Sequence, residues 1–211
     1  MLLQGTTAWG LLTHAVSNSL KPGDWILVHA AAGGVGQLLT QMAKNRLHLN
    51  VIGTSSTSKL NIAKQVGCDH VIDYTVEDVP TKVKEITRGK GVAAVFDGVG
   101  KSTYHASLNS LARDGYLISF GNASGKVPPV DIYELAKGNY KLSRYTNFNY
   151  TGTREDFMNL ANPVLDMLKN SELKPSVYRV YSFEDIKQVR DSHMDLEGRK
   201  TTGKLLLGFN N

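Results

Sequence analysis

A glycine-rich stretch, HAAAGGVG at residues 29–36, has the residue types and spacing of a phosphate-binding loop. The spacing Ala31-x-Gly33-x-x-Gly36 matches the dinucleotide fingerprint, with alanine in the first position. In such a loop the second glycine lets the backbone approach a pyrophosphate, the third lets the helix pack close to the strand, and amides at the helix N-terminus hold the anion. The alternative is a tight turn without a ligand. The surrounding pattern of strand, loop and helix favours the binding loop.

The residues after the next predicted strand indicate which dinucleotide fits. An NAD site places an acidic side chain about 20 positions beyond the loop, where it holds the ribose 2′-hydroxyl. Here the chain reads GTSSTSK, with Ser55 in the expected position and no acid nearby. Ser55 can donate a hydrogen bond to a 2′-phosphate, Lys59 can supply positive charge, and Tyr74 can add a hydroxyl. The sequence therefore favours NADPH over NADH, with an ordinary solvated lysine and a core tyrosine as the alternatives for Lys59 and Tyr74.

Two further glycine-containing segments follow predicted strands. FDGVG at residues 96–100 and SFGNASG at residues 119–125 place small residues where the nicotinamide half of a cofactor needs a close backbone. Asp97 is interpreted as the cap of the following turn rather than as a catalytic acid. No catalytic residue is assigned, because hydride transfer from a nicotinamide depends mainly on positioning and exclusion of water. The six histidines are dispersed, so no metal site is predicted.

The elements that must position these segments alternate between strand and helix. Short apolar runs predict strands at 25–29, 49–53, 70–73, 92–97 and 116–120. Helical spacing predicts helices at about 34–46, 58–66, 79–87 and 102–111. The strands are too apolar to have a solvated face, which is typical of a parallel sheet covered on both sides by helices. The predicted fold class is therefore α/β, a Rossmann-type doubly wound parallel sheet that binds its ligand at the carboxyl ends of the strands.

The pattern changes from about residue 126. After a proline-marked loop we expect, in order, a strand at 141–150, a helix at 154–169, a strand at 175–183, a helix at 183–194 and a strand at 202–209. The expected domains are a dinucleotide-binding domain over 1–150 and a segment, 151–211, that belongs to a different sheet. The strand at 141–150 is interpreted as an edge that pairs with its copy in a homodimer, or as an interior strand of one subunit.

The composition is that of a globular protein. The 211 residues, 41% of them hydrophobic, supply a sizeable core and exclude a disordered chain. The net charge of +5 is scattered, which permits an anionic ligand without indicating nucleic acid. One cysteine, Cys68, excludes an internal disulfide and a thiolate metal cluster within this chain. The first 16 residues show neither a basic leader nor an uninterrupted apolar span, so we expect no membrane segment and a cytoplasmic protein.

Five stretches resemble a known family. LLQGTTAW, KPGDWILVHAAAGGVG, FDGVG, SFGNASG and GRKTTGKLLL are similar, in order and spacing, to the zeta-crystallin-like quinone oxidoreductases, zinc-free members of the medium-chain dehydrogenase/reductase superfamily. The resemblance covers nearly the whole chain. It implies a homodimer that binds NADPH and passes a hydride to a quinone or a similar conjugated carbonyl. The alternatives are an NADPH-dependent alkenal or enoyl reductase, and a non-catalytic crystallin-like protein that binds NADPH or RNA.

The resemblance also assigns residues. It places contacts to the nicotinamide, the pyrophosphate and the adenosine phosphate at Thr7, Ala32, Gly33, Gly34, Val35, Gly36, Ser55, Lys59, Tyr74, Val99, Phe120, Gly121, Asn122 and Arg199. Leu3 stands where zinc alcohol dehydrogenases of the superfamily carry a cysteine ligand, so catalytic zinc is not expected. The family also has an N-terminal β-rich, GroES-like domain that this sequence does not contain. The C-terminal segment is expected to belong to that mostly absent domain.

Overall fold

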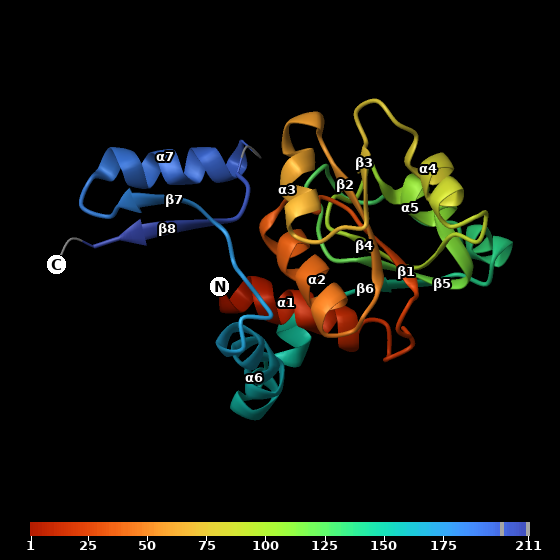
Figure 1. Ribbon diagram of the computed structural model, residues 1–211, viewed down its shortest axis with the longest axis horizontal. Helices are drawn as coiled ribbons and strands as arrows, with labels where there is room; N and C mark the ends of the chain where they lie inside the picture. The colour runs from red at the N-terminus through yellow and green to blue at the C-terminus, as the bar shows by residue number, and fades with distance from the viewer. Residues whose placement is uncertain (199–200, 210–211) are drawn as a thin grey trace.

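The computed structural model describes residues 1–198 and 201–209. A six-stranded sheet with helices on both faces forms its larger part, and a two-stranded sheet with one helix projects from it (Figure 1). The larger sheet contains β1 (Trp25–Val28), β2 (Asn50–Ser55), β3 (His70–Asp73), β4 (Val92–Asp97), β5 (Leu111–Ser119) and β6 (Lys141–Arg144). The strands pair in parallel in the order β3-β2-β1-β4-β5-β6. This order confirms the predicted doubly wound sheet.

Alternate residues of the central strands enter two separate cores. Ile26 and Val28 of β1 face one core, and Leu27 between them faces the other. The first core is closed mainly by α1 (Leu2–Thr13), α2 (Gly34–Asn45), α3 (Leu60–Gln65) and α6 (Arg154–Lys169). The second core is closed by α4 (Val79–Ile86) and α5 (Tyr104–Asn109). Burial on both faces explains why the strands are continuous apolar runs rather than alternating ones.

The helices after the loops begin at side chains that satisfy free backbone amides. Asp78 accepts a hydrogen bond from the Thr81 amide at the start of α4. Thr153 accepts from the Asp156 amide at the start of α6. Such N-caps contribute about 1 kcal/mol each, because the first amides of a helix have no partner within it.

Three predictions for the elements were wrong or incomplete, and one of them is β5, which begins at Leu111 rather than at residue 116. The predicted elements do not include α1, which covers the first core. The predicted strand 141–150 ends at Arg144, and residues Asn147–Tyr150 form a 3₁₀ turn. The Tyr145 amide still donates to the Ser119 carbonyl of β5 at 2.9 Å, but its ring is buried, 4% exposed, with its hydroxyl directly against Gly10 of α1.

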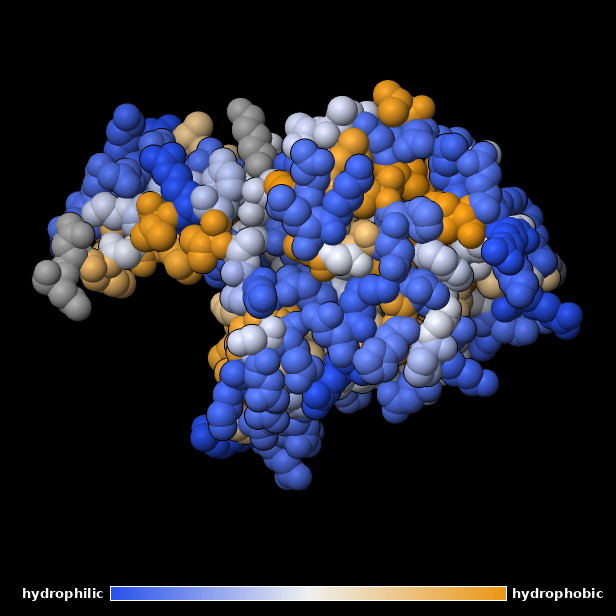
Figure 2. Space-filling model, viewed as in Figure 1, coloured by the Kyte–Doolittle hydropathy of each residue, from blue (hydrophilic) through white to orange (hydrophobic). Residues whose placement is uncertain are grey.

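The smaller sheet consists of β7 (Val177–Ser182) and β8 (Lys204–Gly208), paired in parallel and covered by α7 (Ile186–Glu197). Tyr181 anchors the helix to the sheet, because its buried hydroxyl donates to Asp195 at 2.7 Å. Figure 2 shows hydrophobic residues gathered on the side of this unit that is turned away from α7. Val180 and Leu206, paired in the two strands, are 58% and 39% exposed. No helix in the described part of the chain has the length and hydropathy of a membrane span.

Candidate functional site

The segments singled out in the sequence lie along one edge of the larger sheet. The strands are parallel, so the loops that follow β1, β2, β4, β5 and β6 all emerge at their carboxyl ends. The glycine-rich loop after β1 occupies the middle of this edge. The segment GTSSTSK lies on the β2 side of it, and the two other glycine-containing segments lie on the β4 and β5 side. This is the edge at which open α/β sheets bind ligands.

The glycine-rich loop turns sharply between β1 and α2. Ala30 adopts a positive φ of 52°, and its carbonyl accepts a hydrogen bond from the Gly33 amide at 2.8 Å. A Cβ on Gly36 would lie 2.4 Å from that same carbonyl oxygen, so a side chain there has no room. Gly33 has an ordinary extended backbone, with φ of −81°, and a Cβ there would lie 3.1 Å from Ala30 O. Gly36 is therefore needed for packing, as the fingerprint predicts, and Gly33 is not required by its φ.

Two further loop residues predicted to contact a ligand also have contacts within the protein. The Ala32 carbonyl accepts a hydrogen bond from the Gln37 side chain at 2.8 Å. A Cβ on Gly34 would lie 2.2 Å from Gln4 Nε2, so the amide of Gln4 rests against the loop. The amides of Gly34 and Val35, in the first turn of α2, have no acceptor within the helix. The positive end of the helix dipole adds to their attraction for an anion.

A cavity of about 390 Å³ lies beside the start of α2, at the β5 and β6 side of the edge. It is lined by Leu3, Gln4, Thr7, Val35, Phe120, Gly121, Arg144, Tyr145, Thr146, Asn147 and Phe148. It thus brings together four residues predicted to bind the cofactor, Thr7, Val35, Phe120 and Gly121. Its walls are mostly apolar or uncharged polar, as in sites for flat organic groups.

Several lining residues were missed in the sequence. Arg144 Nη1 donates to Ser119 Oγ at 2.9 Å and to Gly121 O at 3.1 Å, which fixes the guanidinium at the rim. Asn147 Nδ2 donates to Thr6 Oγ1 at 3.0 Å and joins the end of β6 to α1. A strand ending at Arg144 would have placed both residues at the carboxyl edge. The expectation of a strand through residue 150 concealed this.

The adenosine side of the candidate site is built from the ends of β2 and β3. The Tyr74 amide donates to the Ser55 carbonyl at 3.2 Å, so these two predicted residues are neighbours. Ser55 is buried, 3% exposed, whereas the Tyr74 side chain is 56% exposed and is not a core residue. Lys59 Nζ donates to the carbonyl of Thr201 at 3.2 Å. Partial burial lowers the pKa of Lys59. Arg199, the remaining predicted residue, lies outside the described residues.

An acid does lie near this side, at the end of β3, but it is occupied locally. Asp73 is paired in register with Ser55. Its carboxylate accepts from the hydroxyls of Thr57 and Thr75 at 2.5 and 2.6 Å. These hydrogen bonds, that from Thr57 first, lower the pKa of Asp73. Its carboxylate oxygens are thus bonded to neighbouring hydroxyls. Asp73 therefore does not replace the acid after β2 that holds the ribose 2′-hydroxyl in an NAD site.

The loops after β4 and β5 pack against each other. A Cβ on Gly121 would lie 2.3 Å from the carbonyl oxygen of Gly98, so the absence of a side chain serves this contact directly. Asp97 accepts hydrogen bonds from the amides of Val99 and Gly100 at 2.8 and 3.0 Å, which confirms its interpretation as a turn cap. Asn122, at the tip of the second loop, is exposed.

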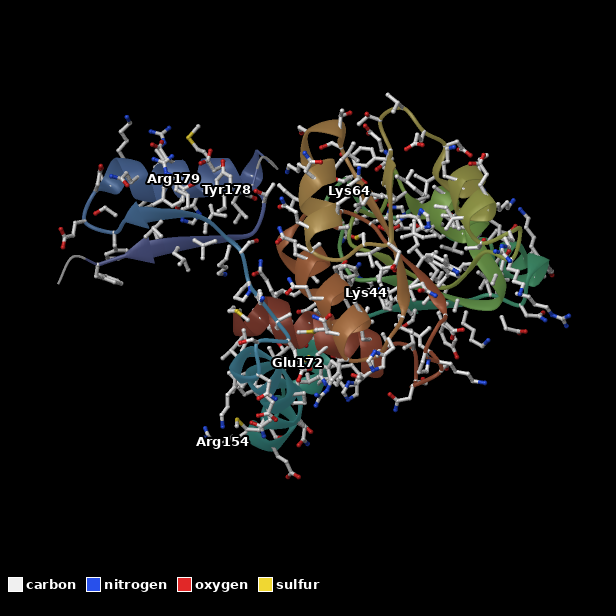
Figure 3. The ribbon with its side chains drawn as sticks, in the orientation of Figure 1. Lys44, Lys64, Arg154, Glu172, Tyr178 and Arg179 are labelled. Carbon is white, nitrogen blue, oxygen red and sulfur yellow. The ribbon has the colours of Figure 1, made fainter. Side chains whose placement is uncertain are left out.

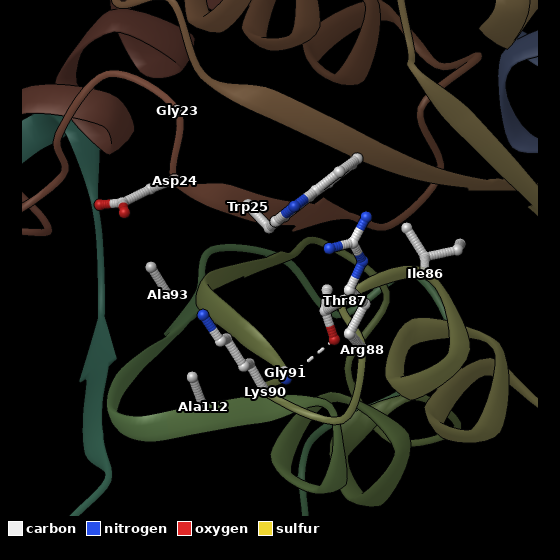
Figure 4. A pocket seen from close by; sticks show the side chains of 10 residues that line it. All are labelled: Gly23, Asp24, Trp25, Ile86, Thr87, Arg88, Lys90, Gly91, Ala93 and Ala112. Atoms are coloured by element: carbon white, nitrogen blue, oxygen red, sulfur yellow. Dashed lines mark hydrogen bonds between the residues drawn. The ribbon is translucent and has the colours of Figure 1, made fainter.

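A larger cavity, about 510 Å³, lies at the opposite edge of the sheet (Figure 4). Its walls come from the start of β1, at Asp24 and Trp25, and from the loop before β4, where the Thr87 hydroxyl accepts from the Gly91 amide at 2.9 Å. The amino ends of the strands lie here, so size alone does not make this cavity the cofactor site. Within residues 1–198 and 201–209, no three His, Cys, Asp or Glu side chains are grouped to hold a metal ion.

Comparison with known proteins gives one family match. The family model for zinc-binding dehydrogenases matches residues 34–165, from the start of α2 into α6. A 2-haloacrylate reductase from a Burkholderia species is 35% identical over 212 residues, covering 98% of this chain and 61% of that enzyme. The chain thus spans about three fifths of the length of the curated relatives that it matches.

Two solved structures are similar over nearly the whole chain. A mycobacterial protein solved in complex with NADPH is 43% identical, with a TM-score of 0.90, covering 99% of this chain and 63% of that one. The Escherichia coli quinone oxidoreductase, also complexed with NADPH, is 36% identical, with a TM-score of 0.88, covering 97% of this chain and 62% of that one.

Proposed function

The chain belongs to the zinc-binding dehydrogenase family, and on that premise we propose that it is the NADPH-binding part of a reductase for quinones or similar conjugated carbonyls. The observation that carries the proposal is the joining of the glycine-rich loop and the 390 Å³ cavity at one carboxyl edge. The loop offers helix amides to a pyrophosphate, and the adjoining cavity is of the size and polarity that a nicotinamide ring and an acceptor need. The two similar structures complexed with NADPH support this assignment.

The residues fit the cofactor from end to end. The amides of Gly34 and Val35 would hold the pyrophosphate, with Gly33 presenting no side chain to it. Ser55, Lys59 and Tyr74 would hold the 2′-phosphate, where a cation and hydroxyls favour NADPH over NADH. At the other end, Thr7, Val99, Phe120, Gly121 and Asn122 would flank the nicotinamide and its ribose, while Ala32 and Gly36 shape the loop and Arg199 would approach from the C-terminal segment.

The chemistry requires position more than acid–base groups. Bound NADPH supplies the hydride that reduces the acceptor. The cavity walls would hold the acceptor against the ring and exclude water. Arg144 is the charged side chain among the described lining residues, and its held guanidinium would stabilise the negative oxygen formed on a reduced quinone. Solvent can protonate such a stabilised oxyanion, so the mechanism needs no buried acid.

The same geometry suits a related class of acceptor. An alkenal, an enoyl compound or a 2-haloacrylate also accepts a hydride at a carbon conjugated to a carbonyl, and a relative is named as a 2-haloacrylate reductase. We propose quinones first, because several relatives are named quinone oxidoreductases. NADPH oxidation measured with a quinone, an alkenal and 2-chloroacrylate separates these classes. A rate confined to the alkenal or the haloacrylate would reject the quinone assignment.

The separate unit of β7, α7 and β8 supports the proposed domain division. Residues 151–211 would return the chain to a second, GroES-like domain, with residues 1–150 forming the dinucleotide-binding domain. The exposed pair Val180 and Leu206 would pack there against further β-structure. Helix α6 lies beyond residue 150 but packs in the larger core, because Val164 lies against Gly5 of α1, so the part that would return to the second domain begins after α6.

The edge position of β6 supports a homodimer. In the described residues β6 is the last strand of the larger sheet, so no strand pairs with its outer side. Leu142 of β6 is 38% exposed. The expected pairing near residues 141–150 would run through β6, Lys141–Arg144, and two copies paired there would continue the sheet across a two-fold axis. Light scattering should give twice the mass of the chain, and a monomeric mass would reject this pairing.

We also propose a cytoplasmic location.

RNA binding stays the non-catalytic alternative. A basic protein can bind RNA through its surface or through its nucleotide cleft. RNA affinity that survives saturating NADPH would support an independent RNA site, and competition would place the RNA in the cofactor cleft.

The primary test is an equilibrium titration of the 211-residue chain with NADPH and NADH, followed by fluorescence. We expect tighter binding of NADPH. Lys59→Ala should weaken NADPH about tenfold, as expected for the loss of one charged contact, and leave NADH unchanged. Lys64→Ala is the matched control, because Lys64 is the next lysine along the chain after Lys59 and lies exposed on α3 (Figure 3). Equal affinity for both dinucleotides, or equal effects of both substitutions, would reject the assignment of the adenosine side.

A further inference from the structure

Four buried polar side chains join the ends of three strands directly beneath the candidate site. His29 follows β1, Thr54 lies in β2 and Asp97 ends β4, while Ser107 lies in α5. None of the four is more than 3% exposed. His29 Nδ1 lies 3.1 Å from Thr54 Oγ1, and His29 Nε2 lies 3.0 Å from Ser107 Oγ. Burial of so many polar groups costs free energy unless each one is paired.

The hydrogen bonds fix the direction of every donor in this group. Ser107 Oγ donates its one hydrogen to Asp97 Oδ2 at 2.8 Å, so it must accept from His29 Nε2–H. The neutral ring then has a lone pair on Nδ1, which accepts the hydroxyl hydrogen of Thr54. His29 is thereby held in one tautomer, with its hydrogen on Nε2.

Electrostatics keep the ring neutral. Burial lowers the pKa of His29, and the negative charge of Asp97 opposes this with a smaller effect. A charged imidazolium would carry hydrogens on both nitrogens and could not accept from Thr54. Neutral His29 is thus the form in which the hydrogen bonds of His29, Thr54 and Ser107 are all made.

Each end of this chain of hydrogen bonds reaches a loop of the candidate site. At one end the Ala30 amide donates to Thr54 Oγ1 at 3.3 Å. Ala30 belongs to the glycine-rich loop, and its carbonyl accepts from the Gly33 amide. At the other end Asp97 Oδ1 accepts the amides of Val99 and Gly100, at 2.8 and 3.0 Å. The two loops therefore take their positions from the same buried ring.

We propose that His29 is a positioning residue for the dinucleotide: held by Thr54 and Ser107, it fixes the spacing between the glycine-rich loop and the loop at residues 98–100. This rests on the proposed function, since it assigns those loops to one bound cofactor. The ring does not touch the cofactor. A dinucleotide spanning both loops requires their spacing to be set before it binds, because preorganised sites lose less free energy on ordering.

The first test compares NADPH dissociation constants of three variants. His29→Phe fills the space without a polar atom and should raise the dissociation constant at least about tenfold, the effect of about 1.4 kcal/mol. His29→Gln retains a donor near Nε2 and should restore most of the affinity. Val92→Ala, a fully buried change at the amino end of β4, is the control for stability alone. If His29→Phe lowers the melting temperature as Val92→Ala does but binds NADPH normally, the role is structural and the proposal is rejected.

The second test needs no cofactor and so remains valid if the wild-type chain fails to bind NADPH. Nitrogen-15 NMR should find the hydrogen of His29 on Nε2, and the other tautomer would overturn the argument. Ser107→Ala removes the acceptor of His29 Nε2–H and one donor to Asp97, and leaves Thr54 and the glycine-rich loop unchanged in sequence. We expect it to speed amide hydrogen exchange at Ala31 and Gly33, across the ring in the glycine-rich loop. Exchange altered only at Val99 and Gly100 would show that the loops are independent.

Discussion

Gly36 gives a sharp test of the loop geometry, because an alanine there must displace backbone. A Cβ at Gly36 would lie 2.4 Å from Ala30 O and 2.8 Å from Ala31 Cα, and neither atom can move without moving the end of β1. Overpacking of this kind costs about 3 kcal/mol at the upper end of its usual range. Alanine recovers about 1 kcal/mol through its higher helix propensity. The expected net loss for Gly36→Ala is therefore about 2 kcal/mol.

Gly34→Ala is the matched control, two positions earlier in the same helix. Its Cβ would meet the far end of the Gln4 side chain, which can rotate away, so we expect a change within about 0.5 kcal/mol. Thermal unfolding followed by circular dichroism should lower the midpoint by about 4–8 °C for Gly36→Ala in a chain of this length. Equal midpoints for the two variants would refute the close approach of α2 to β1.

Three other predictions follow from single residues. Burial lowers the pKa of His29 below its ordinary 6.5, so the folded chain binds fewer protons than the unfolded chain below that pH. Above pH 6.5 the titration of His29 therefore has no effect on the free energy of unfolding. As the pH falls from 6.5 toward the pKa of His29 in the folded chain, this titration lowers the free energy of unfolding by at most about 1.4 kcal/mol per pH unit. Urea unfolding of His29→Gln should lack this component, and identical pH profiles would contradict it. Asp78→Ala removes the cap of α4 and should cost about 1 kcal/mol in the same assay, whereas the exposed Lys84→Ala should cost less than about 0.5 kcal/mol. Burial raises the pKa of Cys68 to about 11, so an aromatic disulfide reagent at neutral pH should label it only after unfolding, and rapid labelling of the native chain would contradict its burial.

The parallel sheet was predictable because its signals are local. Residues 70–73 form β3 as expected, and 92–97 form β4, since each short run is bounded by turn residues; β4 is buried along nearly all of its length, whereas β3 lies at the sheet edge with His70 exposed. Helix α1 was not predictable in the same way. The helix buries Gly5, Thr6 and Gly10 while Leu2 and Leu3 are exposed, so its sequence has no amphipathic pattern. Its glycines and threonines are also weak helix formers, and contacts with α2 and α6 override that preference.

The candidate site was predictable in part, because the resemblance named Thr7, Phe120 and Gly121 of the cavity but not Arg144 or Asn147. The loop after β1 and the segment after β2 carry their chemistry in consecutive residues, so the sequence located both. The cavity beside them depends on Thr7 from α1 and Arg144 from β6, which are brought together only by the fold. Tyr145 shows why the end of β6 was misjudged. Its amide still donates to β5, but its ring is buried against Gly10 and the chain then turns into the 3₁₀ helix at Asn147–Tyr150, which local strand propensity does not reveal.

The residues of the loop HAAAGGVG are therefore explained by different physical requirements. Gly36 is explained by packing within the chain, and the first residue, His29, by its hydrogen bonds to Thr54 and Ser107. Both would be required of a turn that binds nothing. Gly33 differs, because its φ of −81° suits any residue and a Cβ there would meet one carbonyl at 3.1 Å. Packing within the chain requires less of Gly33 than of Gly36, so the missing side chain at Gly33 is better explained by a bound phosphate.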